Sequence, residues 1–524
     1  MRTVLHAAAF AAILALAGPA LARDTQPRLP ASAASPVDED LRLAYQDAND
    51  HIERGEYLQA YGALEALTGK PAFQSATSAL RHATWFLMAG TAGEARDWPK
   101  ARAAIEKAVA FPEADATDWQ VRIQIARSSG DTADGLRSIA VMARRFPKGL
   151  TALSDEDIGR WFDRAKLETD QDLAFDFVDA LLTHWTPNDP FVDPFVELNG
   201  MRQVQVEGLL RQGRTAQAIA ATRKIDNPDV LIAMRADKRF DALSAADPAL
   251  LDPKPAALRQ LARIDALYPA HTDLLSGVDA RTSALLDLNR GEEALAFVET
   301  AITRAQKDPR AFKDIDTRLG WTINLKNVAL GSLGRDEEAL EALETAARVP
   351  EKGKANINQT LNLAGQQMRM GRFKAALATV ASVRDDRLSP YGRAVDLRIT
   401  ACSATQLGDL ATADEALRQL RGVKLEAKRQ LEDALLCRGD LDGAAAMLIE
   451  RLQSPVQRNL ALAGLQVAPL RPSPLPLDVT LRQRIAELCA RPDVRAAIDA
   501  VGRVISYSPE DLWPPKPSAA GKAR

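Results

Sequence analysis

GRDEEALEALETAA, residues 334–347, is the stretch that decides the fold of this chain. After the turn glycine, a small residue follows at Ala339, and apolar residues follow four and seven positions later at Leu343 and Ala346. The same arrangement returns in GRFKAALATVASV (371–383) and GDLATADEALRQL (408–420), so that the three turn glycines recur at a constant interval of 37 residues. A fixed period of this size predicts a stacked array of helical hairpins.

The spacing of these residues has a direct physical interpretation. Offsets of four and three place the small and apolar side chains on one stripe of the second helix of each hairpin. The small residue allows the neighbouring helix to approach closely, and glycine accepts the backbone angles of a tight turn. The arrangement is found along most of the chain, with the small position at Ala60, Ala101, Gly135, Ala174, Ala218, Ala294 and Ala444.

Length and composition limit the alternatives. The chain has 524 residues, too many for one compact core, so several domains or a linear array are expected. Only 5% of the residues are aromatic and alanine is abundant, which favours packed helices over a β-sandwich. The formal net charge is -3, with acids and bases interspersed. This pattern disfavours nucleic acids and anionic membrane surfaces as partners.

The first residues, MRTVLHAAAFAAILALAGPALA, have the organisation of a secretory signal peptide. Arg2 is followed by an apolar run and by the small-x-small site Ala20-Leu21-Ala22. A membrane anchor is the alternative, but the apolar run is short for a bilayer span of about 20 residues. We expect cleavage after Ala22 and a periplasmic or secreted protein without a membrane span.

The pattern also divides the chain. Residues 23–38 are a Pro- and Ser-rich leader, and the hairpins extend over residues 39–228 and 271–455. Between them, residues 229–270 contain the Pro- and Asp-rich run Asp247 to Pro255, which predicts a degenerate helical spacer. Residues 456–524 are expected to form a helical cap over the last apolar face and a Pro-rich tail. Trp513, in this tail, is either a docking residue or is tucked back onto the cap.

These residues and their period resemble the tetratricopeptide repeat (TPR) family, over roughly Glu39 to Pro455. The resemblance implies an all-α, right-handed superhelical solenoid that binds protein or peptide partners along the first helices of its hairpins. The chain departs from the family pattern in that turn glycines are missing near Arg96 and Thr169, and Thr222 and Arg451 occupy positions that should be apolar. An irregular array is therefore expected.

A search for catalytic chemistry yields little. The histidines are far apart and form no HExxH pair, and there is no GxSxG, SxxK or P-loop motif. We therefore predict no enzyme activity, no metal and no cofactor. Of the three cysteines, Cys402 and Cys437 fall on first helices of consecutive hairpins, which leaves a disulfide as one alternative. We favour the other alternative, small buried thiols, because cysteines on helices rarely reach the separation that a bridge requires.

The remaining candidate site is a row of amide and guanidinium side chains on successive first helices of the C-terminal hairpins: Asn324, Asn358, Asn362, Arg398 and Arg429. Such donors can hold an extended peptide backbone or a carboxylate. The alternative is an ordinary solvated helix face. The hypothesis with most support is an exported, non-enzymatic scaffold for protein or peptide partners, with a role in cell-envelope assembly. The alternative function is an enzyme of carbohydrate or envelope-polymer processing, or its accessory subunit, with the solenoid as a substrate cradle.

Overall fold

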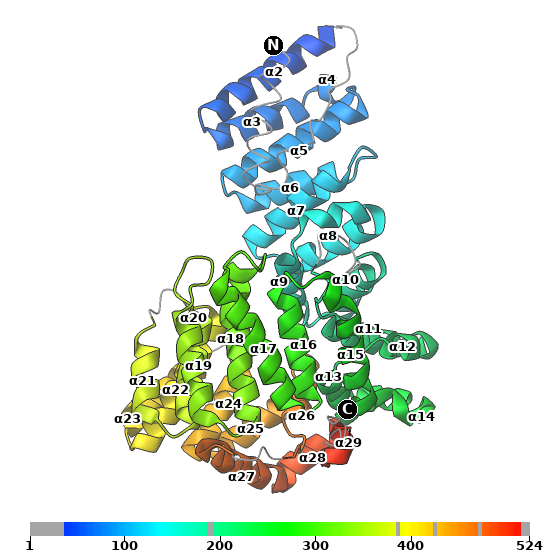
Figure 1. The fold of residues 1–524 in the computed structure, drawn as a ribbon. Coiled ribbons are helices and arrows are strands. Elements are labelled where there is room, and N and C mark those ends of the chain that lie inside the picture. Colours follow the sequence, from blue (N-terminus) through cyan, green and yellow to red (C-terminus); the bar gives the residue numbers. More distant parts are fainter. Residues whose placement is uncertain (1–35, 186–192, 384–387, 423–426, 470–473, 515–524) are drawn as a thin grey trace. The chain divides into compact units, whose positions relative to one another are not determined.

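The computed structural model describes residues 36–185, 193–383, 388–422, 427–469 and 474–514. The predicted signal peptide, most of the leader and the last ten residues of the tail lie outside these ranges. The chain forms two compact units, residues 1–192 and 193–524, each of which is described by itself. The described residues are helical, and their β-structure is limited to three isolated bridges. The expected all-α array of helical hairpins is confirmed (Figure 1).

Unit 1 consists of four helical hairpins and short connecting helices. Its helices are α2 (Pro36–Glu53), α3 (Tyr57–Thr68), α4 (Pro71–Gln74), α5 (Ser78–Glu94), α6 (Trp98–Ala108), α7 (Ala116–Ser129), α8 (Thr132–Arg145), η2 (Pro147–Ala152), α9 (Asp155–Ala165) and α10 (Gln171–His184). The first helix begins at Pro36, slightly before the predicted end of the leader at residue 38, because proline is well tolerated in the first turn of a helix.

Unit 2 begins with irregular helices and continues with regular hairpins. The irregular part contains α11 (Asn199–Arg211), α12 (Thr215–Thr222), α13 (Pro228–Ala236), η3 (Lys238–Phe240), α14 (Asp241–Ala246), η4 (Pro248–Leu251), α15 (Pro253–Leu267) and η5 (Tyr268–Ala270). The hairpins are α16–α17 (Leu275–Asp287, Gly291–Lys307), α18–α19 (Ile315–Ser332, Asp336–Arg348), α20–α21 (Ile357–Arg369, Phe373–Ala381), α22–α23 (Pro390–Leu407, Leu410–Leu420) and α24–α25 (Lys428–Arg438, Leu441–Gln453). Four C-terminal helices follow, α26 (Arg458–Ala463), α27 (Pro476–Ala490), α28 (Pro492–Val501) and α29 (Pro509–Leu512).

The turns between paired helices use the left-handed backbone conformation that the sequence predicted. All the turn glycines of the repeat have a positive φ: Gly55, Gly130, Gly213, Gly334, Gly371, Gly408 and Gly439. Where the glycine is missing, Arg96 and Asn289 adopt the same conformation, with φ of 57° and 56°. At these two turns the geometry is kept although an L side chain makes it less favourable, whereas Thr169, where the sequence also lacked a turn glycine, has no positive φ.

The register of the second helices is also confirmed. Every small position of the repeat is buried, and Ala339, Ala376 and Ala413 have no exposed surface. At Gly135 the contact is closest, because a Cβ there would come within 2.0 Å of the Trp161 ring. The two polar departures are accommodated individually. Thr222 donates its hydroxyl proton to the carbonyl of Ala218 (2.8 Å), and Arg451 forms a buried ion pair with Glu432 (2.6 Å).

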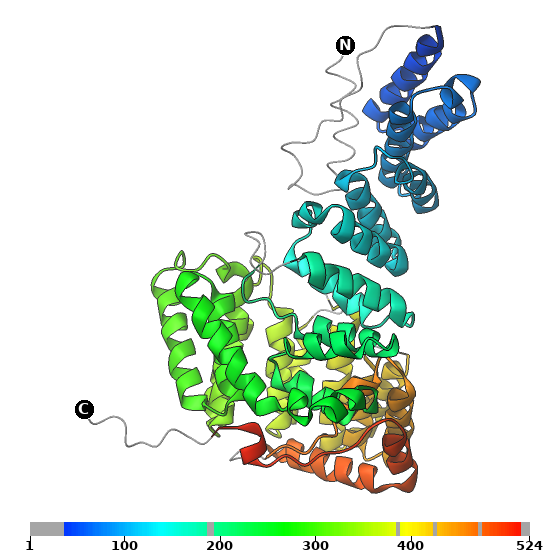
Figure 2. The same cartoon turned by 90° about the vertical axis from the view of Figure 1, so that its right-hand side faces the viewer.

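Unit 2 closes on itself, which the sequence did not predict. Each hairpin packs on the next from α15 to α25, α26 packs on α25, and α26 also packs on α13, near the start of the unit. The predicted spacer therefore lies inside unit 2, where it forms the surface on which the C-terminal helices close. As expected of a cap, α28 covers α25. Figure 2 shows the C-terminal segment, orange to red, returning to the green helices with which the unit begins.

The division into units also lies elsewhere than the sequence placed it. The sequence suggested separate halves on either side of residues 229–270, whereas the two units divide between Val192 and Asp193. The reason is that the segment after the division packs within unit 2. Phe195 lies against Gly277 of α16, where a Cβ would be 2.7 Å from the ring, and Ser276 donates a hydrogen bond to Asp193 (3.1 Å).

Within the described part of the chain, no helix combines the length and the apolar character needed to cross a membrane.

The turn geometry leads to a paired stability prediction in unit 1. Gly55 has a φ of 72° and Gly62 is helical, and an added Cβ would meet no atom within 4 Å at either position. Gly55→Ala should therefore lower the free energy of unfolding by about 1–2 kcal/mol, because of the left-handed backbone alone. Gly62→Ala should raise it by up to about 1 kcal/mol, because alanine is the better helix former. Urea unfolding of the two variants measures both effects, and an equal effect at the two sites would contradict the turn assignment.

Candidate functional site

The structure brings Arg398 and Arg429 together at the junction of α22 and α24. Arg398 is half-buried and donates from Nε to Oε1 of Gln430 (2.6 Å), and Gln430 in turn donates to the hydroxyl of Tyr391 (3.3 Å). Arg429 is exposed, and its ion-pair partner among the described residues is Asp433, 3.9 Å away on the same helix. We call Tyr391, Arg398, Arg429 and Gln430 the basic cluster.

Burial lowers the pKa of the Arg398 guanidinium, and the nearby cations Arg429 and Arg369 act in the same direction. Asp433 opposes this shift through space, but no carboxylate of the described residues forms an ion pair with Arg398. An arginine remains protonated in spite of such a shift. The cluster therefore contains a partly desolvated positive charge whose terminal nitrogens can still donate hydrogen bonds.

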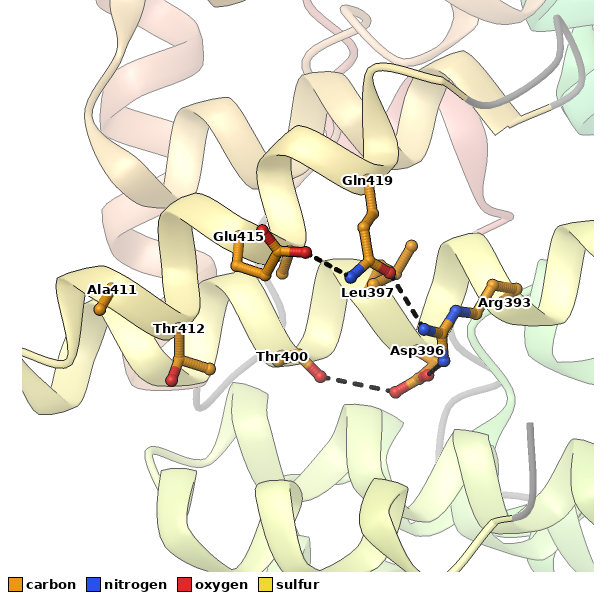
Figure 3. A pocket seen from close by; sticks show the side chains of 9 residues that line it. Arg393, Asp396, Leu397, Thr400, Ala411, Thr412, Glu415 and Gln419 are labelled. Carbon is orange, nitrogen blue, oxygen red and sulfur yellow. Dashed lines mark hydrogen bonds and ion pairs between the residues drawn. The ribbon is translucent and has the colours of Figure 1, made fainter.

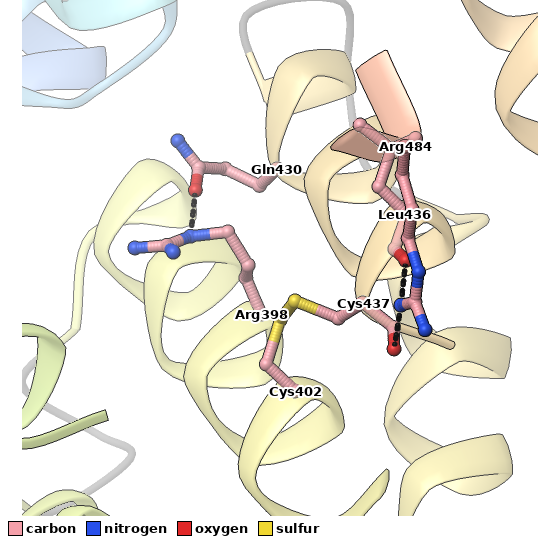
Figure 4. The surroundings of a disulfide bond; sticks show 6 residues. All are labelled: Arg398, Cys402, Gln430, Leu436, Cys437 and Arg484. Carbon is pink, nitrogen blue, oxygen red and sulfur yellow. Dashed lines mark hydrogen bonds between the residues drawn. A yellow bond between two sulfur atoms is a disulfide. The ribbon is translucent and has the colours of Figure 1, made fainter. Parts of the chain in front are cut away.

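A disulfide joins Cys402 and Cys437 directly behind Arg398 (Figure 4). The preference for buried free thiols was therefore wrong. The first helices of consecutive hairpins pack against each other closely enough to give a Cα–Cα distance of 5.1 Å, which suits a disulfide. Arg484 of α27 donates to the carbonyl of Cys437 (2.7 Å) and also to that of Leu436. The bridge fixes α22 and α24, and with them the separation of Arg398 and Arg429. Cys489 is the free cysteine.

The three predicted asparagines lie on other helices and bind locally. Asn324 of α18 accepts a hydrogen bond from Asn327 (3.3 Å). On α20, Asn358 donates to Glu351 (3.5 Å) and Asn362 to Gln359 (3.0 Å). Both α20 asparagines are exposed, and Asn324 is half-buried. Within the described residues no hydrogen bond or ion pair joins them to the basic cluster, so the continuous row of donors stays a prediction.

Two surface hollows in unit 2 are lined by other residues. One, of about 430 Å³, lies between α22 and α23 (Figure 3). Its charged side chains bind one another, since Arg393 donates to Asp396 and Gln419, both at 3.0 Å, and Gln419 donates to Glu415 (2.8 Å). The other, of about 720 Å³, is lined by residues of α17, including Arg304 and Lys307, and by residues that follow this helix. Neither is lined by a residue of the predicted donor row.

An acidic cluster near the start of unit 2 was missed by sequence reasoning. Burial raises the pKa of Asp287 on α16 to about 7, and the carboxylates of Asp229 and Glu197 raise it further. Burial likewise raises the pKa of Asp279, two turns earlier on the same helix, to about 7. Glu197 accepts a hydrogen bond from Asn199 (3.1 Å). Asp287, Asp229 and Glu197 come from separate segments, so no local motif could have revealed the cluster.

Strongly shifted carboxyl groups often mark functional sites, but buried structural carboxyls show the same shifts. Among the described residues no group of three or more His, Cys, Asp and Glu side chains is arranged to hold a metal ion. The histidines lie apart and contact different carboxylates: Nε2 of His82 is 2.6 Å from Oδ1 of Asp118, and Nδ1 of His51 is 2.6 Å from Oε2 of Glu56. The basic cluster therefore remains the arrangement best suited to binding.

Comparisons with known proteins add little about function. No protein-family model and no curated protein matches the chain. Among solved structures, it is similar to the APC/C hetero-tetramer Cut9–Hcn1 (15% identity, 88% of this chain and 91% of that chain, TM-score 0.28). It is also similar to Naa15/Naa10 bound to HypK-THB (12% identity, 88% and 90%, TM-score 0.24) and to the P58(IPK) TPR domain (11% identity, 89% and 99%, TM-score 0.17). TM-scores this low support no inference about function.

The acidic cluster leads to a prediction of pH dependence. Because the pKa of Asp287 is higher in the folded protein than in the unfolded chain, ionisation of this carboxyl opposes folding. Its cost is absent below the unfolded pKa and grows until the pH passes about 7. Asp287→Asn should therefore raise the free energy of unfolding by about 1–3 kcal/mol at pH 8, and the gain should disappear as the pH falls toward 4. Urea unfolding across this range is the measurement.

Asp499→Asn, which changes an exposed carboxylate on α28, is the control and should show no such pH-dependent gain. An equal gain from Asp287→Asn at pH 4 and pH 8 would show that ionisation of Asp287 is not its cause.

Proposed function

We propose that this chain is an exported scaffold that binds a protein or peptide through the basic cluster of unit 2, with a role in the cell envelope. The observation that carries the proposal is Arg398, a charge that the fold partly removes from water without pairing it to a carboxylate of the described residues. Leaving such a group without an anion is costly, and a ligand carboxylate would satisfy it. Arg429 supplies a second, exposed charge close by.

Export is supported by two separate features. The first 22 residues have the pattern of a cleaved signal peptide. The disulfide between Cys402 and Cys437 fits an oxidising compartment, because structural disulfides seldom persist in the cytosol. The disulfide also gives export a structural purpose, since it fixes the two helices that carry the basic cluster.

The enzymatic alternative, processing of carbohydrate or envelope polymer, lacks a comparable observation in its favour. The hollow between α22 and α23 is lined by side chains that already bind one another. The carboxyls of the acidic cluster are half-buried or exposed, and they line neither of the two hollows described above. We therefore propose binding and not catalysis.

The binding proposal predicts a charge-specific loss of capture. Arg398→Gln combined with Arg429→Gln removes both charges without placing a new charge inside the protein. Capture of partners from envelope extract by this double variant should fall at least about tenfold, the loss expected when charge-assisted hydrogen bonds are removed. Capture by the unaltered protein should weaken as salt is raised. Quantitative pull-down beside circular dichroism is the measurement.

The matched control is Arg348→Gln with Arg418→Gln, which removes two exposed arginines, 76% and 70% accessible, from α19 and α23. The control should capture partners as well as the unaltered protein does. Equal capture by both double variants at low salt would exclude the basic cluster as the binding site.

Export predicts a specific chemical state of the mature protein. Protein purified from its own cells should begin at or near Arg23, and under denaturing, non-reducing conditions one thiol per chain, that of Cys489, should react with an alkylating reagent. N-terminal sequencing and mass spectrometry measure the two properties. An intact Met1 together with three reactive thiols would place the protein in a reducing compartment.

A further inference from the structure

The seam where unit 2 closes has a small apolar layer. Ala236 at the end of α13 belongs to the same hydrophobic cluster as Ala461 and Leu462 of α26 and Leu465, which follows α26. These residues are almost fully buried, yet they are few, and two of them are alanines. The seam therefore buries less apolar surface than a hairpin interface built from long side chains would bury.

A second layer lies over the seam and binds both of its sides. We call residues Gly502 to Leu512 the strap. On one side, the amide of Arg503 donates to the carbonyl of Ala236 (2.9 Å), and its guanidinium binds Asp241 (2.7 Å). On the other side, the amide of Tyr507 donates to the carbonyl of Val467 (2.8 Å), and Val467 donates to the carbonyl of Ile505 (3.1 Å).

The fit at the start of the strap depends on a glycine. A Cβ at Gly502 would come within 2.5 Å of the carbonyl oxygen of Ala236 and within 2.6 Å of the Leu462 side chain. Gly502 has an extended backbone, with φ of -168°, so its role is space and not backbone freedom. The strap thus touches α13 and α26 at the same point.

The rest of the strap is held mainly by polar contacts. Arg503 also donates to the carbonyl of Arg235 (3.0 Å), the amide of Ile505 donates to Gln466 (2.9 Å), and Lys254 donates to the carbonyl of Glu510 (2.7 Å). The ion pair of the strap is between side chains that are 37% (Arg503) and 50% (Asp241) exposed, and such pairs contribute little. Tyr507 is the buried apolar side chain of the strap, and its hydroxyl has no hydrogen-bond partner among the described residues. A segment that is held mainly by polar contacts, with one large buried side chain whose hydroxyl is unsatisfied, is expected to open more readily than the surrounding helices.

The seam borders the basic cluster. A Cβ at Gly464, the residue that ends α26, would be 3.9 Å from a terminal nitrogen of Arg429. The two sides of the cluster are thus held in different ways. The disulfide fixes α22 to α24, whereas no disulfide links α26 to α13.

We propose that the strap is a releasable clasp, which holds α26 against α13 and whose release moves α26 away from Arg429. Release would move α26 away from one side of the basic cluster, while α22 and α24, joined by the disulfide, stay in place. Opening would widen the space in which a bound peptide contacts Arg429. The inference rests on the proposed function only in treating Arg429 as part of a binding site.

Hydrogen exchange of the full chain, followed by mass spectrometry, tests the clasp. Gly502→Ala should push the strap off both sides of the seam. Its matched control is Gly365→Ala, where the nearest atom to the new Cβ, on Ile399, would be 4.0 Å away. Amides of residues 458–467 and 503–507 should exchange at least about tenfold faster in Gly502→Ala, with α18 and α24 unchanged. Arg503→Ala is a milder second variant, and Arg495→Ala on α28 is its control.

A second readout reports on the site itself. Labelling of Arg429 by the arginine reagent phenylglyoxal should become several-fold faster in Gly502→Ala and unchanged in Gly365→Ala. Neither readout requires a binding partner. The clasp proposal can therefore be contradicted while the binding proposal stands, and the binding proposal can be contradicted while the clasp proposal stands.

Three results would overturn the inference. Faster exchange in the strap alone would show that it does not hold α26. Faster exchange throughout unit 2 in both strap variants would show that it is part of the core. Unchanged exchange in both variants would show that the contacts of Gly502 and Arg503 do not close the seam.

Discussion

The fold depends on the close approach of two helices at one small residue. In each hairpin the second helix presents an alanine or glycine to its neighbour, and these positions have almost no exposed surface. At Gly135 the Trp161 ring occupies the space that a methyl group would need. Once this distance is set, the stripe of larger apolar residues on the same face meets the next helix, and the hairpins stack. The low aromatic content follows from the same constraint, because short distances between helices leave little room for large rings.

The hairpins could be predicted because they depend on local sequence. A left-handed turn, a small residue and an apolar stripe lie within the sequence of one helical hairpin, so each hairpin can be recognised from its own residues. The pattern also marked the turn without glycine near Arg96, a residue that adopts the left-handed conformation. It also marked Thr222 and Arg451 as departures, although it could not reveal that Glu432 would neutralise the buried arginine.

What the sequence could not predict depends on contacts between distant segments. Gly502 is recognisable as essential only when the carbonyl of Ala236 and the side chain of Leu462 stand beside it. The same holds for Asp287, whose shifted pKa comes from Glu197 and Asp229, and for Arg398, whose significance lies in its burial and in the absence of a paired carboxylate among the described residues. The disulfide was misjudged for a related reason. The distance between Cys402 and Cys437 is set by how consecutive first helices pack against each other. A general rule about cysteines on helices does not predict that packing.

Closure changes the thermodynamic character of unit 2. An open solenoid resembles a one-dimensional chain of coupled units, in which the terminal repeats have one neighbour and fray first. In unit 2 the helices at the two ends of the array, α13 and α26, are neighbours, so while the seam is closed the chain of couplings has no free end at which fraying can start. Unfolding of any one hairpin then breaks two interfaces, and unit 2 should gain cooperativity that its repeats alone would not supply. The cost is kinetic, because the closing contacts join residues such as Ala236 and Arg503 that are far apart along the chain and form late.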